Sequence, residues 1–210
     1  MGACQGQHVD VVSLLLENKA NVHKDDKYGR TPLLLVCKGL INPINFTADY
    51  NIYNIDHKIK TPHMLGFSSK DFQIVSFLLD HGSNIERLDI DNMSPLMYAC
   101  EAGNYQIAEL LITKGAIIGR KFPDGKSILL KTCELKHLEL ARFLSKNGAD
   151  IIDELTYAIK TNDAEMFRHL VDITDNINDV NSVGKTPLII ACSVNFEFIH
   201  MLLEKGSRCE

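Results

Sequence analysis

Six cysteines and two Gly-Lys-Ser/Thr triplets are the residues of this 210-residue chain whose type and spacing could carry chemistry. Cysteine thiolates act as nucleophiles, bind zinc or form disulfides, and a Gly-Lys-Ser/Thr triplet ends the phosphate-binding loop of many nucleotide hydrolases. That loop needs a further glycine five residues before the triplet's own, but Arg120 and Asp179 stand there. The triplets therefore predict no nucleotide site.

Five of the cysteines occupy the same position of a repeated pattern: Cys4, Cys37, Cys100, Cys133 and Cys192. Phe67 and Ile159 take that position in the other copies, which indicates packing rather than reactivity, because a free cysteine behaves as a small buried hydrophobe. Stacked helices about 8–10 Å apart also hold their Cα atoms too far apart for a disulfide. We expect reduced thiols in a reducing compartment, the cytoplasm or the nucleus. Cys209, outside the pattern, is the cysteine expected to react.

The repeated pattern begins with a short phrase of Ser or Thr followed by Pro or a large apolar residue. Its copies are Thr31-Pro32-Leu33, Thr61-Pro62, Ser94-Pro95-Leu96, Ser127-Ile128-Leu129 and Thr186-Pro187-Leu188. A hydroxyl that accepts from a free backbone N–H, with proline at the first helical position, suits the start of a helix. Each phrase therefore predicts a first helix.

A second amphipathic helix follows in most copies, with apolar residues at helical spacing. They are Val11, Leu14, Leu15; Ile74, Phe77, Leu78; Ile107, Leu110, Leu111; and Leu140, Phe143, Leu144. Glycine then ends the helix at Gly82, Gly115, Gly148 and Gly206, as suits a left-handed C-terminal residue. Neither helix can bury its apolar face alone, so the units must stack.

These residues resemble the ankyrin repeat, whose line Asp-x-x-Gly-x-Thr-Pro-Leu leads to a small pair, a Gly, Ile/Val-x-x-Leu-Leu and Gly-Ala-Asp. The chain carries that line in Asp26, Gly29, Thr31, Pro32, Leu33; Ala99, Cys100, Gly103, Ile107, Leu110, Leu111, Gly115, Ala116; and Gly148, Ala149, Asp150. The resemblance implies an all-α solenoid of stacked helix-turn-helix units with β-hairpin-like fingers. It implies a non-catalytic scaffold that binds another protein on its concave face.

We expect one domain over residues 1–210, divided into units at about 1–30 (partial), 31–60 (atypical), 61–93, 94–126, 127–152, 153–185 (degenerate) and 186–210. Asp56 favours this alignment, because it stands where the repeat expects an Asp before Thr61. A second alignment joins 31–40 directly to 70–79 and makes the intervening stretch an insertion of about one unit. Ile59, in place of Gly, favours the second.

The two ends lack the polar outer faces that solenoids need. The chain starts inside a unit, and the last helix keeps Phe198, Ile199, Met201, Leu202 and Leu203. We therefore expect a segment of a longer array, or a monomer with weak association through its uncapped ends. A targeting or regulatory ankyrin segment of a larger enzyme, channel or adaptor is the alternative function.

Composition excludes several other classes of protein. The formal net charge is -5 and 23% of residues are charged. The chain therefore lacks the strongly basic character that would predict nucleic-acid binding. No apolar run approaches the roughly 20 residues of a membrane helix, and the eight histidines form no zinc-binding spacing. We expect no enzyme activity, cofactor, metal or membrane contact.

The resemblance places the partner on the finger tips and on the exposed side of the first helices. By register these are Lys27, Tyr28, Arg30, Lys38, His57, Lys58, Lys60, Ile90, Asp91, Met93, Glu101, Asp124, Lys126, Glu134 and Lys185. Tyr28 and Arg30 are the preferred anchors, since Tyr and Arg are enriched at interface hot spots. The first two tips are basic, which favours a partner with an acidic stretch opposite the N-terminal end.

Overall fold

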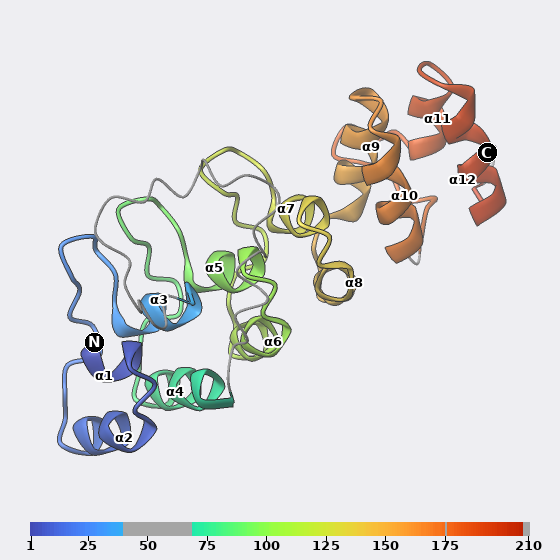
Figure 1. Cartoon of the computed structure of the whole chain (residues 1–210). Helices are drawn as coiled ribbons and strands as arrows, with labels where there is room; N and C mark the ends of the chain where they lie inside the picture. The colour runs from blue at the N-terminus through green and yellow to red at the C-terminus, as the bar shows by residue number, and fades with distance from the viewer. Residues whose placement is uncertain (40–68, 175, 208–210) are drawn as a thin grey trace, which may run out of the picture. The chain divides into compact units, whose positions relative to one another are not determined.

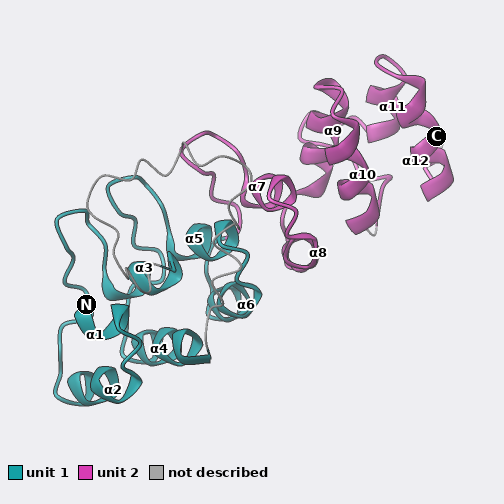
Figure 2. Cartoon of the chain, viewed as in Figure 1, with its two compact units in different colours: residues 1–117 teal, residues 118–210 magenta. Residues whose placement is uncertain are grey.

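The structure, a computed structural model, describes residues 1–39, 69–174 and 176–207. These residues fall into two compact units, Met1–Ile117 and Ile118–Glu210 (Figure 2). Within the described ranges all regular elements are α-helices, and the fingers contain no strand beyond an isolated bridge between Lys121 and Ser127. The expectation of an all-α array of helix pairs is confirmed, while one continuous domain over residues 1–210 stays a prediction.

Three helix pairs build the first unit (Figure 1). They are α1 (Gly2–Gln5) with α2 (Val9–Glu17), α3 (Pro32–Cys37) with α4 (Ser69–Asp80), and α5 (Pro95–Glu101) with α6 (Tyr105–Thr113). The first helices α1, α3 and α5 pack in one row, and the second helices α2, α4 and α6 pack in another. Each pair therefore buries its apolar side against its neighbour.

The second unit repeats this two-row arrangement. Its pairs are α7 (Ile128–Glu134) with α8 (Leu138–Lys146), α9 (Ile151–Lys160) with α10 (Ala164–Ile173), and α11 (Pro187–Ala191) with α12 (Phe196–Lys205). Helices α7, α9 and α11 pack in the first row, and α8, α10 and α12 in the second.

The repeated phrase starts first helices as its chemistry predicts. The hydroxyls of Ser94 and Ser127 accept from the backbone N–H three residues on, at 3.2 and 3.0 Å, and Thr31 and Thr186 do so at 3.4 and 3.3 Å. The Thr61-Pro62 phrase lies outside the described residues. At the other end of the unit, Gly82, Gly115, Gly148 and Gly206 all have φ between 82° and 102°, which confirms their role after the second helix.

Helix packing follows the second of the two alignments. Helix α3 packs against α4 as its partner and against α5 in the first-helix row. This pairing favours the second alignment, while the division into 31–60 and 61–93, whose boundary lies outside the described residues, stays a prediction. The segment between the two helices lies mostly outside the described residues.

The degenerate unit has a different helix start from the others. Helix α9 starts at Ile151, and the Asp150 carboxylate accepts from the Asp153 N–H at 3.0 Å as its N-cap. The expected starting residue, Asp153, instead accepts from the backbone N–H and hydroxyl of Ser182, at 2.9 and 3.1 Å. The Asp150 carboxylate, at the N-cap of α9, thus replaces the hydroxyl of the Ser or Thr that this unit lacks. As the third residue of α9, Asp153 links this helix to the next finger.

Candidate partner-binding surface

Four five-residue turns, which we call fingers, precede α3, α5, α7 and α11. They are residues 26–30, 89–93, 122–126 and 181–185. In each finger the backbone N–H of the first residue donates to the carbonyl of the fifth, at 2.8–3.2 Å. The fourth residue, Gly29, Asn92, Gly125 or Gly184, has φ between 58° and 83°, a left-handed conformation that Gly and Asn tolerate best. Backbone geometry therefore fixes each tip.

The side chain of the first residue reinforces the turn in three of the four fingers. The Asp26 Oδ1 atom accepts from the N–H groups of Tyr28 and Arg30, at 2.9 and 3.0 Å. The equivalent sets are Asp89 with the amides of Asp91 and Met93, and Asn181 with those of Val183 and Lys185. Asp and Asn are favoured in turns because they can bond the backbone two residues on. The recurring Asp position of the repeat thus holds the tips rather than a ligand.

Tyr28 stands at the tip of the first finger between two cations. Its ring centroid lies 4.8 Å from Lys27 Nζ and 4.5 Å from the guanidinium carbon of Arg30, within the range of a cation–π interaction. Arg30 also donates to Asp26 Oδ2 through Nε at 2.9 Å and a terminal nitrogen at 2.6 Å. Tyr28 is 42% exposed. The Arg30 side chain therefore already interacts with the Asp26 carboxylate and with the Tyr28 ring.

The Asp26 carboxylate is stabilised in its charged form. Its partial burial works to raise the pKa, but the hydrogen bonds from the Arg30 side chain and from the Arg30 and Tyr28 amides outweigh that effect. Together with the charge of Arg30, they hold the pKa of Asp26 below its ordinary value. The Asp26 carboxylate of the first finger therefore remains charged at neutral pH.

The next finger lies directly beside the first. The Ile90 N–H donates to the Tyr28 carbonyl at 3.2 Å, and Arg87 pairs with Asp25 at 2.6 Å. A side chain at Gly29 would meet the Ile90 backbone and side chain at 3.4 Å, at a φ of 70°. Ile90 itself is 62% exposed. The two tips therefore present Tyr28 and Ile90 on one fixed surface, which we call the tip surface.

A buried tyrosine connects this surface to the helices below it. The Tyr98 hydroxyl donates to Asp89 Oδ2 at 2.6 Å, and Lys38 Nζ lies 3.1 Å from the same hydroxyl and 4.8 Å from the ring. Burial, and then the hydrogen bond and charge of Asp89, raise the pKa of Tyr98. Lys38 was predicted to bind a partner, but its ammonium already interacts within the molecule.

The structure divides the remaining predicted residues into several groups. Met93 is only 7% exposed: its N–H and carbonyl close the finger and its side chain lies in the core. Asp91, Glu101 and Lys185 are exposed, as are Asp124 and Glu134. Lys126 Nζ pairs with Glu134 at 2.6 Å, and Asp124 lies 3.5 Å from Lys131. His57, Lys58 and Lys60 lie outside the described residues.

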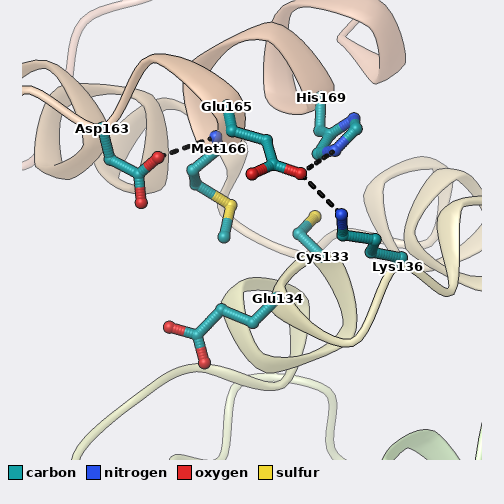
Figure 3. A pocket seen from close by; sticks show the side chains of 7 residues that line it. All are labelled: Cys133, Glu134, Lys136, Asp163, Glu165, Met166 and His169. Carbon is teal, nitrogen blue, oxygen red and sulfur yellow. Dashed lines mark hydrogen bonds and ion pairs between the residues drawn. The ribbon is translucent and has the colours of Figure 1, made fainter. Parts of the chain in front are cut away.

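A small cavity of about 170 Å³ lies in the second unit (Figure 3). Cys133, Glu134 and Lys136 line it from the end of α7, and Asp163, Glu165, Met166 and His169 from α10 and the residue before it. Glu165 stands between Lys136 and His169, with Oε1 at 2.7 Å from Lys136 Nζ and 3.9 Å from His169 Nε2. Of these residues, only Glu134 was predicted from the sequence as a partner-binding residue.

The charged groups of this cavity form an ion pair at the surface, between Lys136 and Glu165. The hydrogen bond from Lys136 lowers the pKa of Glu165, and the same bond raises the pKa of Lys136. Burial, followed by the charges of Glu154 and Glu134, raises the pKa of the Cys133 thiol from its ordinary value of 9.0 to about 12. A thiol so shifted stays protonated at neutral pH and is not an activated nucleophile.

Two further observations concern metal binding and membrane spans. No group of three or more His, Cys, Asp or Glu side chains in the described ranges could hold a metal ion. None of the helices in those ranges is both long enough and apolar enough to cross a membrane. The fixed fingers and the exposed Tyr28 and Ile90 make the tip surface of the first unit the candidate site that the geometry favours.

Comparison with known families agrees with the helix pairs. A family model described as "Ankyrin repeats (3 copies)" matches residues 34–121 and 63–154, more than half of the chain when taken together. A second, described as "Ankyrin repeat", matches residues 1–27. No curated protein is significantly similar to the chain.

Proposed function

The chain belongs to the ankyrin-repeat family, and from that premise we propose that it is a non-catalytic scaffold that binds another protein. Ankyrin repeats are generally protein–protein interaction modules, and stacked repeats present extended concave surfaces for binding. We place the binding site on the tip surface of the first unit, around Tyr28 and Ile90.

The observation that carries this proposal is an exposed aromatic side chain held on a rigid tip. The Asp26 carboxylate accepts a hydrogen bond from the Tyr28 N–H, and the Tyr28 carbonyl accepts one from the Ile90 N–H. The Tyr28 side chain nevertheless remains 42% exposed. A side chain already held in place loses little conformational freedom on binding, so more of its contact energy appears as affinity. Tyrosine is also among the residue types enriched at interface hot spots.

Charge at the same tip favours an acidic partner. Lys27 lies over the exposed ring, and Arg30 stacks against it while its charge is shared with Asp26. A partner segment with a carboxylate next to an apolar or aromatic side chain would contact Lys27, Tyr28 and Ile90 together. Such electrostatic complementarity raises the association rate and weakens with salt.

Affinity capture from a cell extract, compared between matched variants, tests the proposal. We expect the intact array to retain a set of proteins that Tyr28→Ala and Ile90→Ala lose, and that added salt weakens. Tyr157→Ala is the control, because Tyr157 is an equally large and 50% exposed tyrosine in the second unit. Tyr28→Ala should change the free energy of unfolding by less than about 0.5 kcal/mol, as a surface substitution does.

The comparison between variants decides the outcome. Capture that survives Tyr28→Ala and Ile90→Ala, or that Tyr157→Ala abolishes equally, contradicts the placement on the tip surface. We also propose a reducing compartment, the cytoplasm or the nucleus, because no disulfide joins the described cysteines Cys4, Cys37, Cys100, Cys133 and Cys192.

A further inference from the structure

The first helix pair exposes apolar side chains at positions that every other described pair buries. Val11 and Leu15 on α2 are 46% and 45% exposed. In the other pairs the equivalents of Val11 are Ile74, Ile107, Leu140, Met166 and Phe198, and those of Leu15 are Leu78, Leu111, Leu144, Leu170 and Leu202, all at most 6% exposed. We call the surface of Val11 and Leu15 the leading face.

The last pair exposes a different set of positions. Ile189 on α11 is 50% exposed and Cys192, at its end, is exposed as well. The equivalents of Ile189 are Leu34, Met97, Leu130 and Thr156, and those of Cys192 are Cys4, Cys37, Cys100, Cys133 and Ile159, all buried. We call the surface of Ile189 and Cys192 the trailing face.

The two faces are the two sides of one recurring junction. Positions of the leading type are exposed only in the first described pair, and positions of the trailing type only in the last. Between neighbouring pairs within each unit, first helix packs on first helix and second helix on second helix. In the second unit the second helix α10 also packs on α7, the first helix of the preceding pair. There Met166, the equivalent of Val11, and Cys133, the equivalent of Cys192, line one cavity. The leading face of one copy and the trailing face of another therefore continue an interface that the chain already forms within itself.

Polar groups at the junction can also pair. In the second unit, the acidic side chain at the second position of a second helix pairs with a cation of the preceding helix pair: Glu165 with Lys136 at 2.7 Å and Glu197 with Arg168 at 2.6 Å. In the first pair that acidic position is Asp10, and in the last pair the position equivalent to Arg168 is His200. Joining the two faces would bring the Asp10 carboxylate opposite the His200 ring, whose N–H can donate a hydrogen bond to it.

We propose that a second copy of this chain docks head to tail, with its leading face on the trailing face of the first copy. This junction is heterologous, since two different surfaces meet, and a heterologous contact leaves one free face at each end of the assembly. Growth then continues with concentration instead of stopping at a symmetric dimer.

Complementation between two blocked variants tests the proposal on the full chain. Leu15→Asp places a charge on the leading face and Ile189→Asp on the trailing face, both at exposed positions. Ile117→Asp is the matched control, with the same residue type and the same 50% exposure as Ile189. Sedimentation velocity over a wide concentration range measures association, and circular dichroism checks that each variant keeps its helices.

We expect the wild-type chain and Ile117→Asp to sediment faster as concentration rises, while Leu15→Asp and Ile189→Asp each stay monomeric. An equimolar mixture of the two blocked variants should form dimers and nothing larger, because each retains the face that the other lost. A wild-type chain that stays monomeric overturns the proposal. Self-association of Leu15→Asp alone would reveal a symmetric contact between trailing faces and would overturn it as well.

Discussion

The central pair α5 and α6 and the last pair α11 and α12 share a sequence pattern but differ in burial. Both begin with a capping hydroxyl, Ser94 or Thr186, and both keep the small pair Ala-Cys at the same position. Cys100 is buried whereas Cys192 is exposed, and Met97 is buried whereas Ile189 is half exposed. Within the described chain, the last pair has a neighbour on one side alone.

This difference shows that the repeat pattern specifies which side of a pair is apolar, while the neighbouring pair determines whether that side is buried. The pattern is local, because capping and helical spacing depend on residues within one unit. Burial is a property of the stack. Substitutions at equivalent positions of the two pairs should therefore have unequal effects on stability.

The largest effect is expected in the central pair. Leu111→Ala removes a side chain that is 0% exposed, between α4 on one side and the rest of its own pair on the other. Loss of transfer free energy together with the remaining cavity should lower the free energy of unfolding by about 2–5 kcal/mol. Chemical denaturation followed by circular dichroism measures it. A loss below about 1 kcal/mol would contradict the packing of this helix row.

Much of this arrangement could be predicted from the sequence. The capping hydroxyls at Thr31, Ser94, Ser127 and Thr186 and the C-terminal glycines depend on contacts within a few residues, so the repeat alone located them. The pairing of α3 with α4 could not be settled, because it joins segments separated by residues 40–68 through packing. Two alignments therefore remained open until the helix rows were known.

The candidate site was predicted in part for the same reason. Tyr28, Ile90 and Asp91 stand at finger tips, which the repeat places on the surface, and they are exposed. Met93 lies only two residues from Asp91, yet its side chain turns into the core. The ion pair of Lys136 and Glu165 joins two units of the repeat. No spacing within one unit indicates such a contact.

A smaller effect should appear in alkaline solution, where the buried and exposed cysteines diverge. The pKa of Cys133 is raised from 9.0 to about 12 by burial and then by the charges of Glu154 and Glu134. The unfolded chain releases this proton near pH 9 while the folded chain keeps it, so stability from this group is complete below pH 9 and is lost as pH rises toward 12. At pH 10 the loss should be about 1.4 kcal/mol.

Denaturation curves between pH 7 and pH 10, compared with those of Cys133→Ala and Cys192→Ala, isolate this contribution. Cys133→Ala should lose less stability over that range than the wild type, whereas Cys192→Ala retains Cys133 and serves as the control. Labelling of the native chain with a thiol reagent, read by mass spectrometry, should modify Cys192 quickly and Cys100 slowly. This corrects the expectation that Cys192 is protected like the others. Equal pH slopes for all three chains would contradict the shielding of Cys133.

The smallest effect is expected at the trailing face. Ile189→Ala alters a side chain that is half exposed, although Met97 and Leu130 at the equivalent positions are buried, so it should change the free energy of unfolding by less than about 0.5 kcal/mol in dilute solution. Because a partner that binds only the folded state stabilises it by mass action, the substitution should become more costly as the chain is concentrated. Denaturation at several protein concentrations measures this dependence. A cost as large as that of Leu111→Ala in a dilute monomer would mean that Ile189 is already covered, and the contrast between the two pairs would fail.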